Sequence, residues 1–94
     1  MALARVVVFN GVTRERVDEM KREMEGQEQP EDIPASEFVV LHDPEADKSV
    51  VIFFFETDAD YQRADEALNA MPAGDTPGQR ESVTRYDVAM RMTS

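Results

Sequence analysis

Apolar and polar positions alternate with strand or helix spacing along most of this chain. The longest apolar run is residues 50–55 (VVIFFF), in which every residue is β-branched or aromatic. Such a run favours a strand that is buried on both faces. Residues 56–58 (ETD) interrupt it, and either Thr57 or Asp58 can cap a following helix. The apolar positions of that helix form one stripe: Tyr61, Ala64, Ala67, Leu68 and Met71. Pro72 ends the helix because it has no N–H to donate.

The start of the chain repeats this strand-then-helix pattern. Residues 2–10 (ALARVVVFN) are largely apolar on both sides of an extended backbone and predict a first strand. Thr13 is a suitable N-cap for a helix, and Val12 can pack against Val17 as a hydrophobic staple. The helix has a narrow apolar stripe: Val17, Met20 and Met24. Gly26 is a plausible stop, so an amphipathic surface helix is predicted.

The remaining segments read as connections and two further strands. Residues 26–36 contain two prolines and predict an irregular connection, and residues 37–42 predict a second strand. Residues 43–48 begin with Asp-Pro and predict the turn of an antiparallel hairpin. Residues 72–80 hold two prolines and two glycines and predict a loop. Residues 81–92 alternate in polarity and predict a final strand.

The predicted order is therefore β-α-β-β-α-β, in one domain covering residues 1–94. Two split βαβ units of this kind give a ferredoxin-like α+β fold, a four-stranded antiparallel sheet with both helices on one face. The strands at 2–10 and 50–55 are apolar on both sides, so the other sheet face would expose a large apolar patch. A homodimer in which two such faces meet is the expected remedy.

Composition narrows the classes of partner. The chain has 94 residues, a net charge of -10 and no cysteine. The acidic balance argues against nucleic acid and against an anionic membrane surface. No apolar run approaches the roughly 20 residues that span a bilayer. Residues 3–9 are short for a signal-peptide core and are interrupted by Arg5, so no signal peptide is expected. Without cysteine there is no disulfide or thiolate chemistry, and a cytoplasmic location is expected.

Two phrases carry a family resemblance: residues 54–74 (FFETDADYQRADEALNAMPAG) and residues 76–89 (TPGQRESVTRYDVA). With the element order, they resemble the dimeric α+β barrel superfamily, which includes antibiotic-biosynthesis-monooxygenase-type proteins. The second phrase is similar to the last loop and strand of small bacterial members. The resemblance implies a homodimer whose two sheets form a barrel, with a small pocket between sheet and helices in each subunit.

The superfamily includes cofactor-free oxygenases of aromatic polyketides, heme-degrading enzymes and isomerases. The heme-degrading members use a first-strand Asn with a helix Trp and His. Asn10 matches that Asn, but the chain has no Trp and its single His lies at a strand end, which argues against heme degradation. The resemblance thus implies a protein that binds a small aromatic or hydrophobic molecule and that, if it is catalytic, oxidises this molecule without a cofactor. The alternative is a non-catalytic homodimeric ligand-sensing or structural module.

Four side chains are candidates for ligand binding. His42 is the default acid–base group, since its ordinary pKa is near neutral, although its ring can simply bond the neighbouring turn. Asn10 ends a strand on the face that the resemblance places toward the helices, where it can orient a ligand carbonyl or bond nearby backbone. Tyr61 and Tyr86 suit either a pocket wall or the core.

Metal and anion binding have less support in the sequence. One His and no Cys leave mainly carboxylates as metal ligands, and those near His42 lack the spacing of a calcium loop, so no metal site is expected. Arg85 and Arg91 share a strand face and could hold a carboxylate, but ion pairs at the rim or between subunits are favoured.

Overall fold

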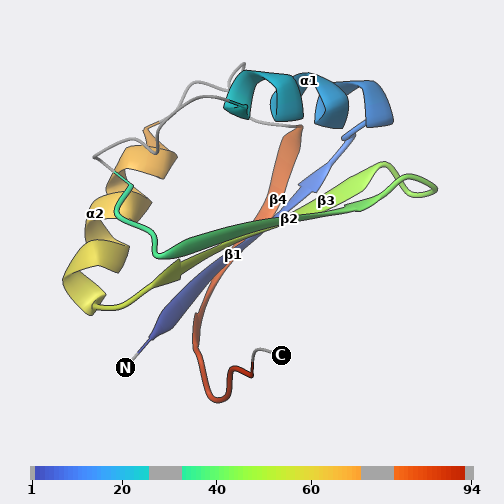
Figure 1. Cartoon of the computed structure of the whole chain (residues 1–94). Helices are drawn as coiled ribbons and strands as arrows, with labels where there is room; N and C mark the ends of the chain where they lie inside the picture. The colour runs from blue at the N-terminus through green and yellow to red at the C-terminus, as the bar shows by residue number, and fades with distance from the viewer. Residues whose placement is uncertain (1, 26–32, 71–77, 93–94) are drawn as a thin grey trace.

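The helices and strands follow one another in the order that the sequence predicts. The computed structural model describes residues 2–25, 33–70 and 78–92 (Figure 1). Its elements are β1 (Leu3–Asn10), α1 (Arg14–Met24), β2 (Glu37–Asp43), β3 (Lys48–Phe55), α2 (Asp58–Asn69) and β4 (Gln79–Asp87). The strands form one antiparallel sheet in the order β2-β3-β1-β4. This confirms the ferredoxin-like α+β fold.

Alternation along the strands separates a face toward the helices from an open face. In β1 the side chains of Leu3, Arg5, Val7 and Phe9 are buried, and Arg5 contacts α2, so these positions face the helices. Their neighbours face the other way. The strand register extends this second set across the sheet as what we call the open face: Val6, Val8, Val39, Leu41, Val50, Ile52 and Phe54. Figure 1 shows both helices on the side opposite to this face.

The core consists of two clusters on the helix side of the sheet. The cluster beneath α2 contains Leu3, Phe55, Tyr61 and Ala64. The cluster nearer α1 contains Val7, Phe9, Val12 and Val51, and Val17 of α1 packs against it. Phe53 packs against both clusters, whereas Phe54 lies on the open face, as the predicted split of the three phenylalanines requires. The second cluster therefore lies between the sheet and α1.

Among the described residues, the N-terminal end of helix α1 has the clearest attachment to the sheet. Val12 is 0% exposed, its N–H donates to the Asp47 carbonyl over 2.7 Å, and its carbonyl accepts from His42 Nε2 over 2.9 Å. Thr13 Oγ1 caps the helix by accepting from the Arg16 N–H over 3.2 Å, as predicted. No residue within α1 itself is buried. The helix therefore begins at a fixed point on the hairpin, while its body lies above the core without entering it.

The predicted final strand is wrong at both ends. β4 covers Gln79–Asp87, because it pairs with β1 from Asn10 back to Leu3 through a register shift between Val8 and Phe9. Past Asp87, one last bond joins the Val88 N–H to the Ala2 carbonyl, 3.0 Å apart, and the ladder then ends. The predicted positions of Gly26, Met71 and Pro72, and most of the connections at 26–36 and 72–80, lie outside the described residues.

Candidate functional site

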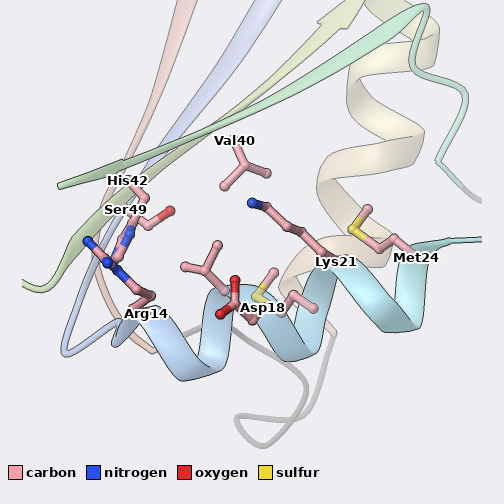
Figure 2. A pocket seen from close by; sticks show the side chains of 9 residues that line it. Arg14, Asp18, Lys21, Met24, Val40, His42 and Ser49 are labelled. Carbon is pink, nitrogen blue, oxygen red and sulfur yellow. The ribbon is translucent and has the colours of Figure 1, made fainter. Parts of the chain in front are cut away.

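A cavity of about 340 Å³ lies between α1 and the sheet (Figure 2). Its walls on the α1 side are Arg14, Val17, Asp18, Met20, Lys21 and Met24. Its walls on the sheet side are Val40 and His42 of β2 and Ser49 of β3. Several of the α1 residues are exposed, so the cavity reaches solvent along the helix. Volumes of about 300–1,000 Å³ are usual for small-molecule pockets.

The cavity exists because of which residues α1 turns toward the sheet. Arg14, Val17, Lys21 and Met24 occur at i, i+3, i+7 and i+10, so they share one stripe of the helix. Two of these four side chains are cationic and keep their charged ends hydrated. Val17 of this stripe packs against the core cluster that contains Val7, whereas the space beside the two cationic side chains stays open beneath the helix.

The strand side of the cavity supplies one titratable ring. His42 and Ser49 are cross-strand partners on the helix face of the hairpin. Ser49 is buried, and its Oγ–H donates to the Leu41 carbonyl over 2.9 Å. His42 Nε2 bonds the Val12 carbonyl, which can only accept, so Nε2 carries the proton. In the neutral ring Nδ1 then has the free lone pair and can act as a base.

The structure does not bring the four candidate residues together. His42 lines the cavity, whereas Tyr61 lies in the core cluster beneath α2. Asn10 follows the buried Phe9, so alternation puts it on the same side as Val6 and Val8. The prediction that Asn10 faces the helices is therefore wrong. Tyr86 pairs with Ala4 on the side away from the helices and is 54% exposed.

The surroundings of Tyr61 favour a structural role. Its ring meets Phe55 edge-on with centroids 5.5 Å apart, and the Arg85 guanidinium lies 4.9 Å from its centroid. Burial raises the pKa of the Tyr61 phenol above its ordinary value of 10.0, and the nearby Asp65 carboxylate raises it further, against smaller opposing effects of two arginines. The phenol therefore stays protonated at neutral pH and is no base.

We expect Tyr61 to ionise above pH 10.0 in the folded protein. Because the folded pKa is the raised one, its contribution to stability is complete below the unfolded pKa and falls as the pH rises from there through the folded pKa. The phenolate absorbance of the Tyr61→Phe variant, subtracted from that of the wild type, isolates this titration. A midpoint at or below 10.0 would contradict the described burial.

The remaining polar contacts on the helix side hold elements together. Arg5 Nε donates to Asp65 Oδ1 over 2.8 Å, and its Nη2 donates to Asn69 Oδ1 over 3.1 Å, which ties β1 to α2. Arg80 of β4 donates to the same Asn69 oxygen over 2.8 Å. This network joins three elements and lies away from the cavity.

Arg85 and Arg91 both form ion pairs, as the sequence favours. Arg85 pairs with Asp58 at the start of α2, over 2.5 Å. Arg91 pairs with Glu37, and its guanidinium also lies over the Phe54 ring, 4.6 Å from the centroid. The segment after β4 therefore reaches across to β2 and β3.

Arg14, Asp18, Lys21 and Ser49 were missed as cavity residues by sequence reasoning. The available signal is the i, i+3, i+7, i+10 spacing that puts Arg14 and Lys21 in register with Val17 and Met24. That spacing identifies a shared stripe but gives no distance from the helix to the sheet.

The described residues provide neither a metal-binding cluster nor a membrane-spanning helix. No group of three or more His, Asp or Glu side chains there could hold a metal ion. None of the helices formed by these residues has both the length and the apolar character needed to cross a membrane.

Comparison of the chain with protein-family models, curated proteins and solved structures gives no match. The chain can be classified by the order of its elements and the topology of its sheet. The β-α-β-β-α-β order and the β2-β3-β1-β4 antiparallel sheet identify the chain as a ferredoxin-like α+β domain.

Proposed function

We propose that this protein is a homodimer that binds a small, largely apolar molecule in the cavity between α1 and the sheet. The observation that carries the proposal is the cavity itself, about 340 Å³ beneath a helix that contributes no buried residue. A ligand of aromatic or aliphatic character would cover the apolar walls made by Val17, Met20 and Val40. Each Å² of apolar surface removed from water contributes about 25 cal/mol, so filling this space favours the bound state.

The homodimer is proposed because the open face of the sheet exposes apolar side chains. Leu41 is 52% exposed, and the central residues Val6 and Ile52 are only half-buried within one chain. Soluble monomers seldom leave a contiguous apolar sheet face uncovered, and a two-fold pairing covers it on both copies at once. This pairing would also agree with the resemblance to the dimeric α+β barrel superfamily, whose membership is part of the proposal.

A second candidate function is cofactor-free oxidation of an aromatic substrate, with dioxygen as the oxidant that accepts the electrons, and His42 favours it. His42 lines the cavity together with Val17, Met20 and Val40, and an imidazole in such a place can take the proton of a phenol or enol. Asn10, Tyr61 and Tyr86 lie outside this cavity, which leaves His42 as the acid–base group of such a reaction. Loss of turnover in His42→Gln with an unchanged melting temperature would support it.

The binding proposal is tested by blocking the cavity. A thermal-shift panel of naphthols, quinols and naphthalene carboxylic acids is run on the wild type, on Met20→Trp and on Glu23→Trp. Met20 lines the cavity, and Glu23 is an exposed residue of the same helix that does not. A ligand at 100 times its Kd stabilises the native state by about 2.7 kcal/mol.

We expect at least one compound class to raise the melting temperature of the wild type and of Glu23→Trp but not of Met20→Trp. Equal shifts in Met20→Trp would move the binding site elsewhere. A flat response of the wild type across the panel would contradict small-molecule binding and favour the non-catalytic structural dimer.

A further inference from the structure

We infer that the ligand of this cavity carries one negative charge, in the form of a carboxylate held between Arg14 and Lys21. The inference rests on the proposed binding function and names the chemical class of the ligand. The lining residues of the cavity include more cationic than anionic side chains, whereas the chain as a whole has a net charge of -10.

The chain has 20 acidic and 10 basic residues, and Arg22 and Arg63, which do not line the cavity, are exposed without an ion pair among the described residues. Most basic side chains in the described residues do bond an acidic or amide group: Arg5, Arg16, Lys48, Arg80, Arg85 and Arg91. Arg14 and Lys21 form no ion pair or side-chain hydrogen bond with any residue in the described part of the chain. Both line the cavity.

The acidic group of the cavity does not neutralise them. Asp18 is the carboxylate among the described lining residues, one turn from Arg14, yet it lies within ion-pair distance of neither cation. The two cations and one carboxylate among the lining residues leave one excess positive charge. A bound monoanion balances it.

Arg14 and Lys21 line the same cavity from positions seven residues apart on α1, about 10.5 Å along the helix axis. Both side chains are long, so one bound group that lies between them can contact both. Figure 2 shows the Lys21 ammonium extended from α1 toward the strand side of the cavity, below Val40, and Arg14 at the end where His42 and Ser49 lie. The space between the two charged ends is where a carboxylate would bind.

The neighbouring polar groups cannot replace these donors. The Ser49 hydroxyl already donates to the Leu41 carbonyl, and the His42 Nε2–H already donates to the Val12 carbonyl. These two donors are therefore already used and are not available to a bound anion. Arg14 and Lys21 would therefore bind the carboxylate, and Val17 and its neighbours would contact the apolar part of the ligand.

The test compares two ligands of the same shape, 1-naphthoate and 1-naphthamide, by titration calorimetry at one fixed ionic strength. Charge-assisted hydrogen bonds are stronger than neutral ones, so naphthoate is expected to bind about tenfold more tightly than naphthamide. Arg14→Gln and Lys21→Gln should each weaken naphthoate binding roughly three- to tenfold and leave naphthamide binding unchanged.

Arg22→Gln is the matched control. Arg22 is an exposed residue of α1 that neither lines the cavity nor forms an ion pair with the described residues. Arg22→Gln changes the net charge of the protein by the same amount as Arg14→Gln or Lys21→Gln. Naphthamide binding as tightly as naphthoate, or Arg22→Gln weakening naphthoate as much as Arg14→Gln, would overturn the charge inference and leave the cavity proposal intact. Failure of both ligands to bind would overturn both.

Discussion

The Arg5→Ala variant is expected to lose about 3 kcal/mol of unfolding free energy, the lower end of the usual range for breaking a buried ion pair. Arg5 is 2% exposed, lies on the helix side of β1, and bonds both Asp65 and Asn69 of α2. Its removal leaves the Asp65 carboxylate without its cation and leaves a void beneath α2. The lower end applies because the Asp65 side chain is 35% exposed, so water can solvate part of the orphaned charge.

Chemical denaturation with urea measures this loss. The control is Arg63→Ala. This variant removes an exposed arginine of α2 that has no ion pair among the described residues. Its effect should stay within about 0.5 kcal/mol, as for most surface substitutions. Equal losses in the two variants would mean that the Arg5 network does not hold α2 to the sheet.

The second large effect is expected at the open face, where Ile52→Lys should convert a dimer into a monomer. Ile52 lies in the middle of β3, between Val6 and Val39 in the register, at the centre of the open face. Two-fold pairing would bury two lysines against apolar neighbours, and an unpaired buried charge costs several kcal/mol. Within one chain the same lysine faces water, so the domain itself stays folded.

Sedimentation velocity at micromolar concentration measures the oligomeric state of the wild type and of each variant. The wild type and Gln62→Lys, which adds the same charge at an exposed position of α2, should sediment as dimers, and Ile52→Lys as a folded monomer. A monomeric wild type would contradict the homodimer, and a dimeric Ile52→Lys would place the interface elsewhere.

The sequence predicts the elements well because their signals are local. The apolar run at 50–55 becomes β3, and Thr13 and Thr57 cap α1 and α2 by accepting from N–H groups three residues on. Alternation also separates Phe54 from Phe53 and Phe55 correctly. These features depend on a few consecutive residues and on the period of the backbone.

Features set by distant partners were not predictable in the same way. The end of β4 depends on where β1 begins, since pairing stops near Ala2 whatever the polarity of residues 88–92. The cavity depends on how far α1 lies from the sheet, which the stripe of Val17, Met20 and Met24 does not encode. His42 enters the site through its cross-strand position opposite Ser49 and its bond to Val12.

Small-molecule binding beneath α1 is tested most directly by a two-dimensional NMR titration of the isotope-labelled protein with 1-naphthoate and 1-naphthamide. The proposed site predicts that backbone signals of Val17, Met20 and His42 move with ligand, while those of Val6 and Leu41 on the open face stay fixed. Shifts confined to the open face, or no shifts with either compound, would contradict a binding site between α1 and the sheet.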